Sequence, residues 1–275
     1  MRNYSEKRPS IRGLIIYYIL SCLISWIIWL PIVINKQLGY NIPVLSYQHY
    51  LASVGPMLAA IIITLYYGGL EGLRKFIRNI FTINGKIKWI CFGILSPVAM
   101  FLVAIVINFV ITGNWPNLMR FGIPEDLPRF NIIQAILLWI ITYGFGEEIG
   151  WRGVALSNLQ NKIKPMNAAV IIGLGWALWH LPAFFFRDTY MAMGAFEIFG
   201  WAISLIFGSV FLTWLYNASE GSVFVTALWH ALFDAATVGE ISIGVIPMIL
   251  SVIVIAMTIA VMPRVNRVKV KTLST

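Results

Sequence analysis

Three polar clusters interrupt an otherwise apolar chain, and their side chains are of the types used in hydrolytic chemistry. They are Glu147-Glu148-Ile-Gly-Trp-Arg152, Trp176-Ala-Leu-Trp-His180 and His230-Ala-Leu-Phe-Asp234. Each cluster lies in, or at the edge of, a stretch hydrophobic enough to cross a membrane. An Asp, Lys or Arg side chain at membrane depth costs at least about 2.5 kcal/mol, so these groups need partners or a wet cavity. The clusters therefore predict an enzyme that works inside the bilayer.

The glutamate cluster combines an ion pair with a second carboxylate. On a helix, Glu148 and Arg152 stand at positions i and i+4 and can pair. Glu147 is rotated by about 100° from Glu148. We therefore expect Arg152 to neutralise and orient Glu148, leaving Glu147 to face a cavity, where it could take a proton from water. The alternative interpretation of the pair is an ordinary salt bridge at the cytoplasmic edge.

The histidines supply the other groups that hydrolysis needs. His180 lies in one span, and His230 and Asp234 project from one face of another at i and i+4. A histidine near Glu147 could position the attacking water, and a second could donate to the oxyanion of a tetrahedral intermediate. Asp234 could orient His230 or, if protonated, bind the oxyanion itself. Each residue alone could be structural, and His49 is interpreted so, but their coincidence favours one shared site.

The composition predicts an all-α fold, a polytopic bundle of about eight transmembrane helices. Of the 275 residues, 59% are hydrophobic and 11% are charged, whereas soluble domains carry about 25% charged residues. A single integral domain, 1–275, is expected, with the motif-bearing helices in 131–240. Because about 20 apolar residues span the hydrocarbon core, we predict spans at roughly 13–34, 48–67, 88–112, 131–149, 167–186, 196–216, 222–238 and 243–262. The fourth span would end on the glutamate cluster.

The distribution of basic residues explains the net charge of +9. Alternate loops and ends carry Lys and Arg in a ratio of roughly four to one, which the positive-inside rule reads as both termini in the cytoplasm. Most of the basic residues thus face the anionic cytoplasmic leaflet and fix the orientation of the helices in the membrane. No nucleic-acid partner is therefore expected. The expected partners are the lipid bilayer and a peptide or membrane-protein substrate, in a bacterial cell membrane. No oligomeric state is predicted.

Two segments outside the spans carry weaker signals. Residues 70–80 alternate apolar and basic side chains at helical spacing, which predicts an amphipathic helix at the membrane surface; an ordinary basic loop is the alternative. Residues 113–130 form the longest outer loop and show no functional signal.

Cys22 and Cys91 both lie in apolar segments and are interpreted as inert thiols.

The order of the motifs resembles that of a known family. E-E-x-x-x-R, then aromatic-x-x-x-H, then H-x-x-x-N/D, on separate spans, looks like the CPBP family of intramembrane endopeptidases, also called the Abi or CAAX-protease family. Its eukaryotic members cleave prenylated CAAX proteins. The resemblance covers about 140–240. It implies that Glu147 activates water together with His180, that His230 and Asp234 form an oxyanion site, and that the neighbouring ion pair gives support.

Two residues depart from the family pattern, and one of them bears on cofactors. Trp176 stands where the family often has Phe, and Asp234 stands where prenyl-protein proteases have Asn. Because Asp is a charged acceptor unless protonated, it could instead be a metal ligand. The candidate ligands for Zn²⁺ are Glu147, His180, His230 and Asp234. The same residues can work without a metal, and we expect that no cofactor is required.

The leading expectation is an endopeptidase that uses activated water and forms no acyl-enzyme, because no G-x-S-x-G, H-E-x-x-H or G-x-G-D motif is evident. Two alternatives belong to other classes. A proton-coupled transporter also uses buried Glu, His and Asp, but it would show inverted repeats, and the only internal echo is Ala-Leu-Trp-His. A non-enzymatic immunity or scaffold protein would tolerate conservative changes in the polar clusters.

Overall fold

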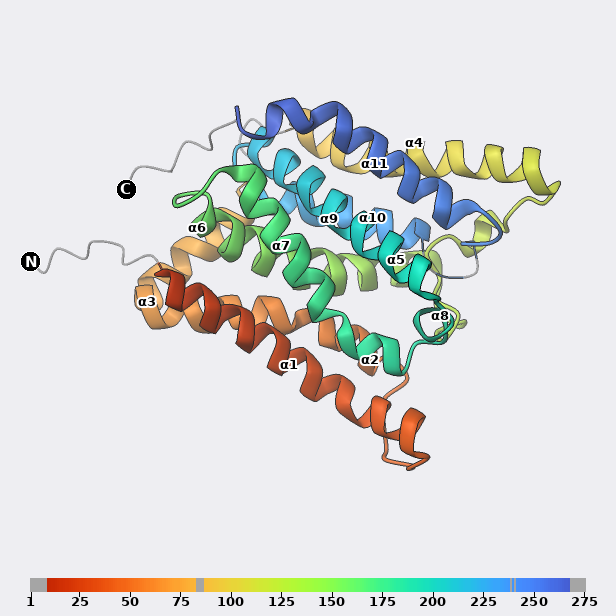
Figure 1. Cartoon of the computed structure of the whole chain (residues 1–275), viewed down its shortest axis with the longest axis horizontal. Coiled ribbons are helices and arrows are strands. Elements are labelled where there is room, and N and C mark those ends of the chain that lie inside the picture. Colours follow the sequence, from red (N-terminus) through yellow and green to blue (C-terminus); the bar gives the residue numbers. More distant parts are fainter. Residues whose placement is uncertain (1–8, 83–86, 238, 240, 268–275) are drawn as a thin grey trace, which may run out of the picture.

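The computed structural model describes residues 9–82, 87–237, 239 and 241–267. Within them every regular element is a helix, and the helices form one bundle (Figure 1), which confirms the all-α prediction. The elements are α1 (Ile11–Leu38), α2 (Gln48–Leu51), η1 (Ala52–Val54), α3 (Gly55–Ile80), α4 (Ile87–Thr112), η2 (Leu118–Arg120), α5 (Ile132–Trp139), η3 (Ile140–Glu147), η4 (Ile149–Leu156), α6 (Ser157–Leu159), α7 (Pro165–Trp179), η5 (Leu181–Phe185), α8 (Asp188–Met191), α9 (Ala195–Ala218), α10 (Val223–Thr237) and α11 (Ile246–Val265).

Seven stretches of the described chain are long and apolar enough to cross a membrane. They are Ile11–Leu38, Gln48–Ile80, Ile87–Thr112, Ile132–Leu159, Pro165–Phe185, Ala195–Ala218 and Ile246–Val265. The remaining predicted span, 222–238, corresponds to α10, an apolar helix of 15 residues. At 1.5 Å per residue it is about 22 Å long, shorter than the hydrocarbon core. A polytopic bundle of seven long helices and one short one results.

The first described helix begins and the last one ends at the same end of the bundle (Figure 1). An even number of membrane crossings is needed for this arrangement, so the short α10 also counts as a crossing.

We expect the end of the bundle where α1 begins and α11 ends to be cytoplasmic. A C-terminal reporter that is active only in the cytoplasm should therefore be active, whereas activity of a reporter that works only outside would reject this orientation.

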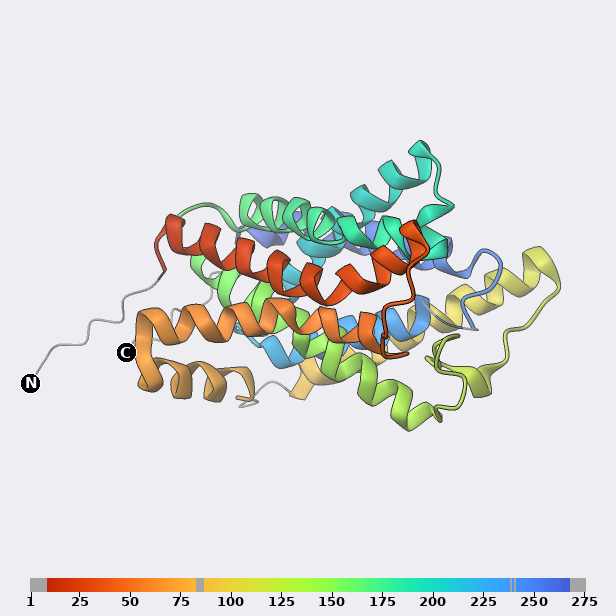
Figure 2. The same ribbon diagram turned by 90° about the horizontal axis from the view of Figure 1, so that it is seen from below.

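The predicted amphipathic segment 70–80 is helical. Gly69 breaks α3 with φ 62° and ψ −164°, a conformation that side chains with a Cβ rarely adopt. The chain then turns sharply, and residues 70–80 form a separate helical stretch (Figure 2). The helix prediction is confirmed and the loop alternative is wrong; a place at the membrane surface stays a prediction.

The fourth predicted span, 131–149, ends too early. The helix runs without interruption over Ile132–Leu159, and its middle consists of two π-helical stretches, η3 and η4, joined at Glu148. π-Helical segments are often found at functional sites. The glutamates therefore lie inside the bundle, where each has a hydrogen-bond partner from another helix, and not at its edge.

Small residues let neighbouring backbones approach this π-helical segment, as is typical of membrane helix packing. A Cβ on Gly144 would lie 2.7 Å from the carbonyl oxygen of Ala227, and one on Gly146 would lie 2.8 Å from that of Ser53. Both distances are shorter than ordinary contacts. These glycines thus set how close η3 comes to α10 and to η1.

We expect Gly146→Ala to destabilise the protein by about 1–3 kcal/mol, the usual result of overpacking. The backbone of Ser53 would have to move. Gly208→Ala in α9 is the matched control, because its Cβ would meet nothing within 4 Å. The control should be neutral or slightly stabilising. Thermal unfolding in detergent compares the two; equal melting temperatures would contradict the packing argument.

Candidate active site

Glu147 ends η3 and is fully buried, with 0% exposure. Its Oε2 accepts hydrogen bonds from the indole nitrogens of Trp176, at 2.7 Å, and Trp151, at 3.3 Å. Its Oε1 has no hydrogen-bond partner among the described residues. One carboxylate oxygen is therefore fixed by two donors, and the other is left for a further group.

The predicted pair of Glu148 and Arg152 is present. Arg152 Nη1 lies 2.7 Å from Glu148 Oε1, and both side chains are completely buried. The same oxygen lies 3.0 Å from His230 Nδ1. The cytoplasmic-edge interpretation is thus wrong, because the pair lies in the interior and links η4 to α10.

His230 lies between two carboxylates. Its Nδ1 faces Glu148, and its Nε2 lies 3.4 Å from Asp234 Oδ2, one turn later on the same helix. The ring of Trp176 stands edge-on to it, with centroids 5.2 Å apart and planes at 88°. His230 is buried, whereas the Asp234 side chain keeps 18% of its surface exposed. Asp234 therefore lies on the more open side of the histidine.

His180 lies at the point where α7 ends and η5 begins. Its Nδ1 is 2.8 Å from the carbonyl oxygen of Trp176. Since a carbonyl only accepts, Nδ1 carries the hydrogen, and in a neutral ring Nε2 has a free lone pair. Rings of Trp179, Trp201 and Tyr190 surround it, with centroids 4.7, 5.6 and 6.4 Å away.

Trp176 is the common neighbour that brings the three clusters together. Its indole nitrogen holds Glu147, its carbonyl oxygen holds His180, and its ring edge contacts His230. The sequence motif predicted Trp176 only as the aromatic residue of the second cluster, and its role as a hydrogen-bond donor was missed. This hydrogen bond could have been predicted from the sequence, because a buried indole N–H usually finds an acceptor and a glutamate inside the membrane needs a donor.

The candidate metal ligands were tested against the geometry. Among the residues that the structure describes, no group of three or more His, Cys, Asp or Glu side chains could hold a metal ion. Glu147, His180, His230 and Asp234 thus do not form a preassembled zinc site. Independence from metals stays a prediction for experiment.

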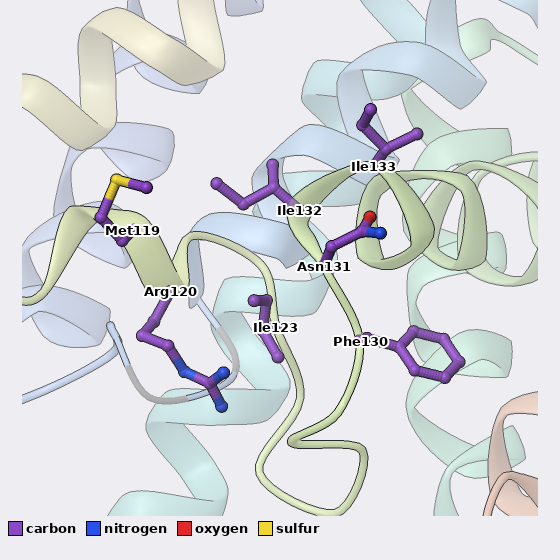
Figure 3. A pocket seen from close by; sticks show the side chains of 7 residues that line it. All are labelled: Met119, Arg120, Ile123, Phe130, Asn131, Ile132 and Ile133. Atoms are coloured by element: carbon purple, nitrogen blue, oxygen red, sulfur yellow. The ribbon is translucent and has the colours of Figure 1, made fainter.

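A pocket of about 440 Å³ lies elsewhere, beside the start of α5 (Figure 3). Its lining residues are Met119, Arg120, Ile123, Phe130, Asn131, Ile132 and Ile133. None of the predicted site residues is among them, and most of the lining is apolar. The candidate active site is instead the buried cluster around Trp176.

Two comparisons with known proteins concern the part of the chain that contains this site. Residues 129–236 match the family model described as Type II CAAX prenyl endopeptidase Rce1-like. That stretch contains all three polar clusters. The chain is also 23% identical over 231 residues to CAAX prenyl protease 2 of Methanococcus maripaludis, covering 80% of this chain and 82% of that protein.

Both findings support the resemblance to the CPBP family noted from the motifs. They indicate that this protein is a membrane endopeptidase, a hydrolase. The transporter and scaffold alternatives are not favoured. The comparisons do not assign roles to individual residues, and those roles follow from the geometry as proposals.

Proposed function

We propose that this protein hydrolyses a peptide bond in a CAAX-type substrate with a water molecule activated by Glu147 and His180. The observation that carries the proposal is the free Oε1 of Glu147, which is buried while Oε2 is held by two indole N–H groups. A carboxylate fixed through one oxygen presents the other in a defined direction. That is the geometry required of a general base.

The reaction starts with proton transfer. Glu147 Oε1 takes a proton from water, and the Nε2 lone pair of His180 accepts the second water hydrogen and holds the molecule. The water oxygen attacks the carbonyl carbon of the scissile bond, and the carbonyl oxygen becomes an oxyanion. When the C–N bond breaks, Glu147 returns its proton to the leaving amine. The products are a carboxylic acid and an amine.

His230 is the proposed donor to the oxyanion. Its Nδ1 is engaged by Glu148 at 3.0 Å, but its Nε2 lies 3.4 Å from Asp234, longer than the usual 2.9–3.0 Å or so for an N–H···O bond. Because both ring nitrogens face carboxylates, the ring is the imidazolium form with a hydrogen on each nitrogen. The Nε2 hydrogen is therefore available to a developing negative charge. Asp234 orients the ring, and the Glu148–Arg152 pair holds its opposite side.

The proposal is tested with purified protein in detergent and a peptide library that includes CAAX peptides. We expect cleavage that survives a chelator under conditions that strip zinc from a control zinc endopeptidase. If activity falls and returns with Zn²⁺, the metal-free route is wrong and Asp234 becomes the leading candidate for an additional ligand. Failure to cleave any peptide would contradict the proposed activity.

A further inference from the structure

A second polar cluster, the outer cluster, lies at the end of the bundle opposite to the start of α1. It consists of Tyr50 and His49 from α2, Asp126 from the loop 113–130, and Arg187 from the connection between η5 and α8. Arg187 Nη1 lies 3.0 Å from His49 Nε2, and His49 Nδ1 lies 3.4 Å from Asp126 Oδ2. The hydroxyl of Tyr50 donates to Asp126 Oδ1 at 2.6 Å. The loop that showed no functional signal thus contributes a carboxylate to a built cluster.

Arg187 has no carboxylate within ion-pair distance among the described residues. A guanidinium only donates, so His49 Nε2 is the acceptor and His49 Nδ1 faces Asp126 with its hydrogen. Burial lowers the pKa of Arg187, but Tyr143, Tyr50 and Asp126 raise it, and the net direction is upward. The group therefore stays charged. Asp126 is reached only through His49, so a half-buried cation with no carboxylate in direct contact gains from an anion that reaches it.

Two tyrosines connect the outer cluster to the catalytic groups. Tyr143 lies one turn before Glu147, and its ring is edge-on to Tyr50 with centroids 6.1 Å apart. Tyr190, three residues after Arg187, lies nearly parallel to the His180 ring at 6.4 Å and 15°.

The outer cluster also faces the open side of the site. Tyr143, His180, Arg187 and Tyr190 are each half-buried, whereas Glu147 is fully buried. A substrate that reaches Glu147 from the partly exposed residues therefore passes close to the arginine.

We propose that Arg187 binds the free C-terminal carboxylate of the peptide substrate while Glu147 acts on a bond further from that end. The inference rests on the proposed function and names the substrate class. Arginine matches a carboxylate with parallel N–H groups, and only Nη1 of Arg187 has a hydrogen-bond partner among the described residues. A CAAX box lies at a C-terminus, so its carboxylate is near any bond cut in or beside it. Arg187 is thus a specificity-determining residue.

The test measures equilibrium binding in the Glu147→Gln background, where no turnover is expected. The probe is a fluorescent farnesylated CAAX peptide with either a free C-terminal carboxylate or a C-terminal amide. We expect the acid to bind about tenfold more tightly or better, the usual effect of a charged hydrogen bond. Arg187→Gln should weaken binding of the acid to the level of the amide and leave the amide unchanged, and Arg187→Lys should restore part of the preference.

Lys36→Gln is the matched control. It removes a cation at the same end of the bundle, from an exposed pair with Asp188 at 2.7 Å, and should keep the preference for the acid. Equal binding of acid and amide to the protein with Arg187 intact would overturn the proposal. So would an equal loss for both peptides in Arg187→Gln, which indicates a structural role.

Hydrolysis, measured separately with Glu147 present, distinguishes the two proposals. A preference for the acid without cleavage supports the assignment of Arg187 while rejecting the proposed activity. Cleavage without any preference rejects the assignment alone.

Discussion

Glu147→Gln is expected to lower the rate of peptide hydrolysis by about 10²–10⁴-fold, the usual contribution of a general base. Gln keeps the shape of the side chain, and its carbonyl oxygen can still accept from Trp176 and Trp151. What the variant loses is the basicity of Oε1, the oxygen that has no hydrogen-bond partner among the described residues. The variant should therefore insert and fold normally while failing to take a proton from water.

The measurement is single-turnover cleavage of a CAAX peptide, together with thermal unfolding of each variant. Glu71→Gln is the matched control, because it makes the same chemical change at an exposed position in the amphipathic part of α3. His180→Ala should be similarly slow if His180 holds the same water. A Glu147→Gln enzyme with a near-normal rate would show that another group is the base.

Arg152→Ala is expected to destabilise the protein by about 3–5 kcal/mol, because breaking a buried ion pair leaves an uncompensated charge. Glu148 would remain completely buried, with His230 as the remaining ion-pair partner among the described residues. Activity should fall as well, mainly through loss of folded protein. Glu148→Gln should act in the same direction by leaving Arg152 unpaired.

Thermal unfolding in detergent, measured beside activity, checks this expectation. Lys36→Ala breaks the exposed pair with Asp188 and should change stability by no more than about 1 kcal/mol. If Arg152→Ala loses activity while its melting temperature stays unchanged, Arg152 takes a direct part in catalysis and the structural explanation is wrong.

Helical periodicity was sufficient to predict the local parts of the site. Two pairs at i and i+4, Glu148 with Arg152 and His230 with Asp234, face each other because their spacing matches a helical turn. The end of the fourth span was mispredicted for the opposite reason. A hydropathy window treats two adjacent glutamates as the edge of a span, but their partners Trp176 and His230 lie 29 and 82 residues further on.

The outer cluster could not be predicted from any periodic pattern. Its residues come from a short helix, a proline-containing loop and an interhelical connection, and 76 residues separate Tyr50 from Asp126. Only the folded bundle brings them to one place. Arg187 belongs to none of the sequence motifs, and no spacing in the sequence predicts its neighbours.

The direction in which α7 and α10 run has a consequence for the cellular compartment of the substrate. Both helices begin at the end of the bundle where α1 starts (Figure 1). The partly exposed site residues come late in them, because His180 directly follows α7 and Asp234 lies in the last turn of α10. The partly exposed site residues therefore lie towards one leaflet, and the start of α1 and the end of α11 lie towards the other. If the termini are cytoplasmic, the substrate must present its cleavable end from the extracytoplasmic face, as an exported or translocated polypeptide does. A single topology reporter would thus decide from which compartment substrates are recruited.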